Sequence, residues 1–238
     1  MGYSPDKLII SNSADELFKE AAACIAQYAN ECVQAKGVFS FSLAGGGTPK
    51  RLYQQLTSSP LIEQIPWASC HFYFGDERMV PHDHDDSNYA MAHKSLFERA
   101  PIPAGNIHPI PTDCDTAQEC ANRYAQEIGN LPGLDLVLLG IGQDGHTASL
   151  FPGTDILHED TRPVSAVYVE KFRSWRISMT YPLINRAKQA IVLISGSDKS
   201  EIVHQVLNTD NPDVSFPIQG IRPLGQLSWF VDKDAYAG

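Results

Sequence analysis

The chain has 238 residues, of which 43% are hydrophobic, and its formal net charge at pH 7 is −10. This composition suffices for a buried core, but no apolar run approaches the roughly 18 to 20 residues that cross a membrane. The acidity argues against nucleic acid as a partner, because a phosphate backbone requires a basic surface. It does not exclude a small anionic substrate held by a few local cations and backbone amides.

The first third of the chain alternates strands with helices. Hydrophobic periodicity predicts strands at 7–10, 38–43 and 70–74. It also predicts a helix over 14–36, which Ser11 or Ser13 caps and Gly37 ends. Shorter helices are expected after Pro49 and near 60–65.

A glycine-rich loop, Ala44-Gly-Gly-Gly-Thr-Pro49, follows the second strand. Its three glycines allow successive amides to form an anion nest. Thr48 is a good N-cap and Pro49 fits the first helical position, so free amides and the positive end of a helix point at one place. The loop therefore predicts a phosphate site, with a tight turn that binds nothing as the alternative.

Charged residues follow the third strand in the run Gly75-Asp-Glu-Arg78. Ligands of open α/β sheets collect at the carboxyl ends of the strands, which supports a functional role, with an exposed, solvated loop as the alternative. The histidines and aspartates of 82–86 are close in sequence, but alternate residues on a loop do not fix a tetrahedral metal site. We therefore expect no metal there. After this loop, we expect a helix from Asn88 to about Ala100, capped by Ser87.

The stretch 134–153 carries the most information. It begins with an apolar strand at 136–139 and breaks at three glycines, Gly140, Gly142 and Gly145, which permit a sharp turn. Asp144 and His146 lie in this turn, just beyond the end of the strand. A histidine in that position is a candidate general base at neutral pH.

The remaining pattern predicts a helix from Asp115 or Thr116 to Ile128 and another over 200–207. Further strands are expected at 164–169, 176–180, 188–194 and 226–231. Lys199 falls in the first turn of the last helix, where a cation opposes the helix dipole and hints at an anion nearby. We expect one α/β domain over 1–238, with a Rossmann-like, mostly parallel sheet covered by helices on both faces.

Five cysteines are odd in number and show no Cys-x-x-Cys spacing. We therefore expect neither a disulfide framework nor a zinc ribbon, which favours a reducing cytoplasm. The first six residues lack a basic head followed by an apolar stretch, so we expect no secretory signal. We also expect a monomer with no membrane partner.

Three motifs stand in a fixed order: 44–49, Gly75–Pro81 with Ser87-Asn-Tyr89, and Gly140-Ile-Gly-Gln-Asp-Gly-His-Thr-Ala-Ser-Leu-Phe-Pro-Gly153. Together they resemble the 6-phosphogluconolactonases, within the wider family that includes the glucosamine-6-phosphate deaminases. The resemblance runs from about Ser40 to the last strand. Gly47 stands where the family more often has serine, which removes one hydroxyl donor. The deaminases carry Tyr in place of Arg78 and Phe-Asn-Glu in place of 149–151.

The resemblance implies hydrolysis of 6-phospho-D-glucono-1,5-lactone to 6-phosphogluconate in the oxidative pentose phosphate pathway, without a cofactor. A lactone is a reactive ester, so one base that activates water and donors for the oxyanion suffice. The candidate catalytic residues are His146 as base, Asp144 to orient it or brace the turn, and Asp76 to order the pocket. The candidate phosphate-binding residues are Gly45, Gly46, Gly47, Thr48, Arg78, Arg176 and Lys199. Which cation contacts the phosphate and which polarises the carbonyl is left open.

Two alternatives share this fold: a sugar-phosphate deaminase-isomerase, and a sugar-phosphate-binding protein without activity. A nicotinamide dehydrogenase is disfavoured because the glycine loop lacks the Gly-x-Gly-x-x-Gly spacing. A serine hydrolase is disfavoured because the chain lacks a Gly-x-Ser-x-Gly elbow.

Overall fold

A computed structural model describes residues 3–128, 131–208 and 216–237. Its central sheet has six strands in the order β1-β9-β8-β5-β2-β3, and all neighbouring strands are parallel. The strands are Lys7–Ser11 (β1), Phe39–Leu43 (β2), Cys70–Phe74 (β3), Leu136–Leu139 (β5), Gln189–Ile194 (β8) and Gln226–Asp232 (β9). The predicted α/β class with a mostly parallel sheet is confirmed. The prediction of no secretory signal depends in part on Met1 and Gly2, which lie outside the described residues.

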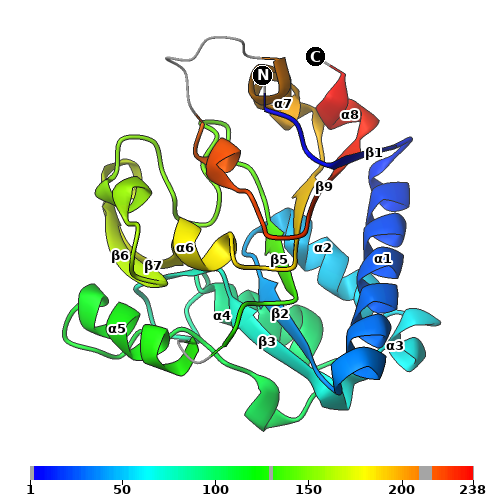
Figure 1. Ribbon diagram of the computed structural model, residues 1–238, viewed down its shortest axis with the longest axis horizontal. Coiled ribbons are helices and arrows are strands. Elements are labelled where there is room, and N and C mark those ends of the chain that lie inside the picture. Colours follow the sequence, from blue (N-terminus) through cyan, green and yellow to red (C-terminus); the bar gives the residue numbers. More distant parts are fainter. Residues whose placement is uncertain (1–2, 129–130, 209–215, 238) are drawn as a thin grey trace.

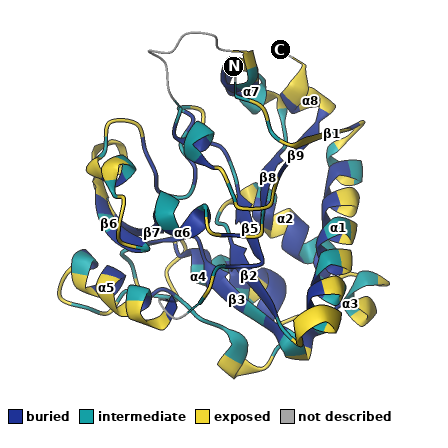
Figure 2. Ribbon diagram, in the orientation of Figure 1, coloured by how far each residue is buried: buried dark blue, intermediate teal, exposed yellow. Residues whose placement is uncertain are grey.

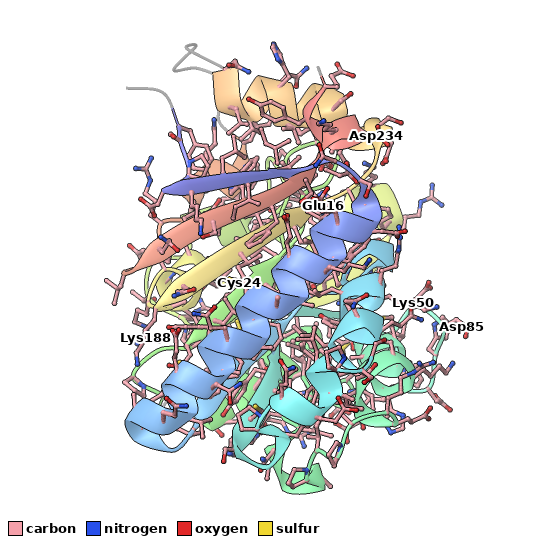
Figure 3. The ribbon with its side chains drawn as sticks, turned by 90° about the vertical axis from the view of Figure 1, so that its right-hand side faces the viewer. Glu16, Cys24, Lys50, Asp85, Lys188 and Asp234 are labelled. Carbon is pink, nitrogen blue, oxygen red and sulfur yellow. A yellow bond between two sulfur atoms is a disulfide. The ribbon has the colours of Figure 1, made fainter. Side chains whose placement is uncertain are left out.

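Helices pack along this sheet. The helices are Ala14–Lys36 (α1), Gly47–Leu56 (α2), Leu61–Gln64 (α3), Asn88–Ala92 (α4), Ala117–Ile128 (α5), Tyr181–Ile184 (α6), Ser200–Asn208 (α7) and Lys233–Tyr236 (α8). In Figure 1, α1, α2 and α3 lie to the right of the central strands. Figure 3 views the molecule from that side, with α1 crossing in front of the sheet and Cys24 near its middle. The described helices are too short or too polar to span a membrane.

The local signals at the ends of α1 are confirmed. The Ser13 side chain accepts a hydrogen bond from the Glu16 amide at 3.3 Å, which makes Ser13 the N-cap. Gly37 ends the helix with φ of 80°, a left-handed conformation that favours glycine. The apolar face between these caps is buried against the sheet, and Figure 2 shows the central strands buried as well.

A second, antiparallel sheet has the order β4-β7-β6. It contains Asp76–Arg78 (β4), Val164–Val169 (β6) and Ser174–Met179 (β7). Figure 1 shows β6 and β7 on the side of the central strands opposite to α1. The sequence predicts the longer two strands but not their separation from the central sheet. It predicts no strand at 76–78, because three residues are too few to show an alternating pattern.

Other expectations need correction. The expected helix from Asn88 to Ala100 ends early: α4 gives way to a π-helical turn over His93–Phe97. Lys199 closes a 3-10 turn and precedes α7 instead of opening it. Cys114 and Cys120 form a disulfide with a Cα–Cα distance of 5.5 Å, although the spacing matches no recognised motif. This is a single bridge and no framework, but it weakens the cysteine argument for a reducing compartment.

The topology brings four loops to one edge of the central sheet. Strands β8, β5, β2 and β3 are consecutive neighbours. All are parallel, so their carboxyl ends and the loops that follow share that edge. The chain runs from β2 to β3 on one side and then crosses to β5 on the other. The crevice at such a reversal is where open α/β sheets bind ligands.

Candidate active site

The loops at this edge, together with strands β4 and β7 of the small sheet, enclose a cleft of about 250 Å³. The predicted site residues in its lining are Gly45, Gly46, Asp76, Arg78, His146, Arg176 and Lys199. Gly47, Thr48 and Asp144 do not line it. Asp144 instead lines a larger hollow of about 620 Å³, which neither His146 nor either arginine lines. The smaller cleft is therefore the one that combines a base with cations.

A tight turn after β5 presents His146. The Gly142 amide donates to the His146 carbonyl at 2.9 Å, and the Gly145 amide donates to the Gly142 carbonyl at 2.9 Å. The Nδ1 atom of His146 is hydrogen-bonded to Oδ1 of Asp144. The imidazole also stacks on Phe151, with ring centroids 4.0 Å apart. These contacts fix the ring and leave Nε2 as the nitrogen available for chemistry.

Burial and a carboxylate act in opposite directions on His146. Burial lowers the pKa of the imidazole below its ordinary value, although Asp144 and Asp76 act to raise it. Burial raises the pKa of Asp144, but the hydrogen bond and charge of His146, with a contribution from Lys171, lower it below its ordinary value. A neutral imidazole beside an ionised carboxylate follows, and this is the protonation state that a general base requires at neutral pH.

The glycines of this turn serve different purposes. Gly145 has φ of 76° and needs the left-handed freedom of glycine. Gly142 does not, but a Cβ there would lie 2.0 Å from Cε1 and Nδ1 of His146. Gly142 therefore makes room for the imidazole. A Cβ on Gly140 would meet nothing within 4 Å, so the predicted backbone requirement at all three glycines holds for Gly145 alone.

Asp76 is held by two residues from distant parts of the chain. Its carboxylate accepts hydrogen bonds from Ser149 Oγ at 2.6 Å and from Asn88 Nδ2 at 3.0 Å. Asn88 also approaches the glycine loop, because a Cβ on Gly45 would lie 1.9 Å from its Oδ1. Asp76 thus connects the loops that follow β2, β3 and β5. These contacts fit the predicted ordering role.

Glu77 explains the Ser87-Asn-Tyr89 motif. Its carboxylate accepts from the amides of Asn88 and Tyr89, each at 2.8 Å, and from Ser87 Oγ at 3.0 Å. It also accepts from the Arg78 amide at 2.8 Å. Burial raises the pKa of Glu77, and the three backbone amides act against that shift. Glu77 therefore fixes the start of α4 beside the cleft and does not itself line the cleft.

Two arginines supply most of the positive charge. Arg78 and Arg176 face each other directly in the antiparallel pairing of β4 with β7. Like charges in that position are destabilising, and among the described residues neither arginine forms an ion pair with a carboxylate. Burial lowers the pKa of Arg176, with Asp76 acting to raise it. Such a pair indicates a site for an anion.

Lys199 adds a third cation to the cleft lining. Its Nζ lies 3.7 Å from Asp198, and 24% of its side chain is exposed.

The His82–Asp86 loop brings no set of metal ligands together. His82 Nε2 is hydrogen-bonded to the Ile110 carbonyl at 2.8 Å. Within the described residues, the side chains close enough together to hold a metal ion are those of Asp113, Cys114 and Cys120. The two cysteine sulfurs are already joined in a disulfide.

The glycine loop differs in detail from its prediction. The N-cap of α2 is Gly46, with φ of 101°, instead of Thr48. The left-handed bend at Gly46 starts the helix two residues early, so Thr48 and Pro49 lie inside its first turn. That turn contains no acidic residue, and its amide donors remain at the cleft end of the helix. An anion site there remains a prediction.

Known proteins are similar to this chain in sequence and fold. The family model of glucosamine-6-phosphate isomerases/6-phosphogluconolactonase matches residues 12–229. The chain belongs to this family. It is 35% identical to the 6-phosphogluconolactonase of Synechocystis sp., over 92% of each chain, and 38% identical to that of Nostoc sp., over 86% of each. A solved 6-phosphogluconolactonase from Trypanosoma cruzi superimposes with a TM-score of 0.88 at 29% identity, covering 100% of this chain and 98% of the other.

A monomeric glucosamine-6-phosphate deaminase has the same fold, with a TM-score of 0.85 at 23% identity over 97% of this chain and 99% of the other. Three residues that distinguish this chain from the deaminase pattern given above lie in or beside the site. Arg78 lines the cleft, Ser149 holds Asp76, and Phe151 stacks on His146. Sequence reasoning missed the roles of Asn88, Ser149 and Phe151. All three lie within the motifs that carry the resemblance.

Proposed function

We propose that this chain hydrolyses 6-phospho-D-glucono-1,5-lactone to 6-phospho-D-gluconate. One observation carries the proposal: His146, hydrogen-bonded to Asp144, lines the same cleft as Arg78, Arg176 and Lys199. This arrangement offers a base at one part of the cleft and an anion site at another. Relatives named 6-phosphogluconolactonase match this chain over most of their length, which supports the same reaction.

In the proposed mechanism, Nε2 of His146 removes a proton from water as the water oxygen attacks C1 of the lactone. A bond forms between that oxygen and C1, and the carbonyl oxygen becomes an oxyanion that nearby donors stabilise. The oxyanion then re-forms the carbonyl as the bond between C1 and the ring oxygen breaks, and the imidazolium returns its proton to the ring oxygen. The carboxylic acid so formed ionises, which releases one proton and gives 6-phospho-D-gluconate. Asp144 keeps Nδ1 engaged, so the proton moves through Nε2 in both steps.

The phosphate anchors the far end of the substrate in this proposal. Arg78 and Arg176 suit bidentate contact with phosphate, and Lys199 supplies a point charge. The amides of the glycine loop and the N-terminal end of α2 add donors. Anchoring the phosphate orients C1 against His146, so binding energy from a remote group contributes to the rate.

His146→Ala tests the base. We expect a folded variant whose kcat is lower by about a hundredfold or more, because general-base catalysis contributes about that much. The assay measures proton release from freshly prepared 6-phosphogluconolactone and subtracts its spontaneous opening. Near-normal turnover would exclude His146 as the base.

Substrate comparison tests the anchor. The phosphorylated lactone should be turned over with a much higher kcat/KM than glucono-1,5-lactone. Equal efficiency would remove the phosphate role of the cations. Release of ammonia from glucosamine 6-phosphate, or binding of 6-phosphogluconate without lactone turnover, would instead favour the deaminase or the inactive binding protein. We also propose a cytoplasmic monomer of one domain, which sedimentation and cell fractionation test.

A further inference from the structure

The hairpin tip between β6 and β7 lies against the catalytic turn. This tip comprises residues 170–173, a 3-10 turn over Glu170–Phe172 followed by Arg173. Lys171 Nζ lies 3.4 Å from Oδ2 of Asp144, whose Oδ1 is hydrogen-bonded to His146. Lys171 is 27 residues from Asp144 in sequence. A cation from the small sheet therefore contacts the carboxylate that holds the histidine.

The next residue, Phe172, anchors the tip to the cleft. The Arg176 guanidinium lies 4.9 Å from the centroid of the Phe172 ring, which is within cation–π range. Phe172 also packs edge-on against Phe151 at 5.9 Å, and Phe151 stacks on His146. The position of Lys171 is thus fixed by residues that already belong to the site, although its own side chain is 60% exposed.

We propose that Lys171 is a positioning residue for the lactonase reaction, and that it acts by holding the Asp144 carboxylate in the orientation that engages Nδ1 of His146. The inference rests on the function proposed above. The terminal torsion of an aspartate is broad and nearly two-fold, so rotamer preference alone does not hold either oxygen toward the imidazole. A cation on Oδ2 restricts that rotation and leaves Oδ1 for His146.

The electrostatics agree in direction. Lys171 contributes to lowering the pKa of both Asp144 and His146, which favours the ionised carboxylate and the neutral base. The charged or titratable groups around His146 are Asp144 in its own turn, Asp76 and Arg78 from β4, Arg176 from β7, Lys199 after β8, and Lys171 from the tip. Lys171 contacts the carboxylate of Asp144 directly, so substituting Lys171 is the simplest way to alter the Asp144–His146 pair.

The expected effect is modest. An exposed ion pair is worth at most about 1 kcal/mol, which corresponds to about a fivefold change in rate. We therefore expect Lys171→Met to lower kcat by about twofold to fivefold with little change in KM. Removing a cation that lowers the pKa of His146 should also move the acidic limb of the kcat/KM profile to higher pH. Salt screens exposed charges, so that displacement should shrink at high ionic strength.

Two variants complete the experiment. Lys171→Arg keeps the charge and should restore most of the rate. Arg173→Met removes a neighbouring cation from the same tip, and among the described contacts its side chain makes no ion pair with Asp144. It should match wild type in kcat and in the position of the acidic limb. Thermal unfolding of each variant checks the fold.

The outcomes are distinguishable. If Lys171→Met matches Arg173→Met in kcat and pH profile while wild type hydrolyses the lactone, the inference is wrong and the proposed function stands. If Lys171→Met instead raises KM and leaves kcat and the acidic limb unchanged, Lys171 acts in substrate binding and the inference is also wrong. If wild type itself fails to accelerate lactone opening, the proposed function fails first.

Discussion

Gly142→Ala tests whether the position of the His146 ring, and not merely its presence, sets the rate. An ideal Cβ on Gly142 would lie 2.0 Å from Cε1 and Nδ1 of His146, and 2.9 Å from Oδ1 of Asp144. Non-bonded carbon atoms are comfortable at about 3.5 Å or more, so the ring must retreat by more than about 1 Å. Gly142 does not have a left-handed φ, so alanine is compatible with the turn itself.

The retreat breaks the contact between Asp144 and His146 or displaces Nε2 from the attacking water. A misplacement of about 1 Å in a catalytic group costs on the order of a hundredfold in rate. We expect Gly142→Ala to lower kcat by about that factor, with KM changed far less, because the arginines and Lys199 are untouched. Proton release on adding the fresh lactone measures both constants.

Gly140 itself lines the cleft, so the control is Gly105→Ala, in a 3-10 turn outside the cleft lining. Its Cβ would meet no atom within 4 Å, and its φ is not left-handed, so kcat should stay close to wild type. Thermal unfolding shows whether each variant is folded. Wild-type kcat in a folded Gly142→Ala protein would refute the argument that this glycine exists to admit the imidazole.

Three further predictions concern Gly45, the pH profile and the disulfide. Gly45→Ala should impair turnover, because its Cβ would lie 1.9 Å from Oδ1 of Asn88, and adding Asn88→Ala should recover part of the loss by removing the clash. The acidic limb of the kcat/KM profile should have its midpoint below about 6.5, the ordinary pKa of histidine, because burial lowers the pKa of His146; a midpoint above that value contradicts this. Reducing the Cys114–Cys120 bridge, which closes a short loop, should lower the free energy of unfolding by about 2 kcal/mol in a urea titration and leave kcat unchanged.

Patterns that act over a few residues predicted much of this fold. Cys70–Phe74, Leu136–Leu139 and Val164–Val169 are strands over the predicted residues, and α1 has the predicted bounds. These elements follow from apolar periodicity and from caps such as Ser13 and Gly37, whose effects are local. The edge of the sheet that holds the site was predictable as well, because it depends only on the strands being parallel.

Contacts between distant segments were not predictable in this way. Asn88 lies 12 residues from Asp76, and Ser149 lies 73 residues from it, yet both hold its carboxylate. Lys171 reaches Asp144 only because β6 and β7 form a hairpin in a second sheet whose third strand has three residues. The residue types in such contacts are common on surfaces, so no spacing in the sequence distinguishes them. The resemblance to a family placed Ser149 and Asn88 within its motifs but assigned neither of them a role.

The glycines show that the sequence of a motif does not reveal what each of its residues does in the structure. Each glycine run looks like a source of backbone freedom, but in both runs a single residue uses it: Gly46 with φ of 101° and Gly145 with φ of 76°. Gly45 and Gly142 provide space instead, the first for Asn88 and the second for His146. These two functions respond differently to alanine, because a left-handed glycine loses its turn whereas a space-making glycine displaces one identifiable side chain. Substituting the glycines one at a time therefore separates the folding of the loops from the geometry of the base.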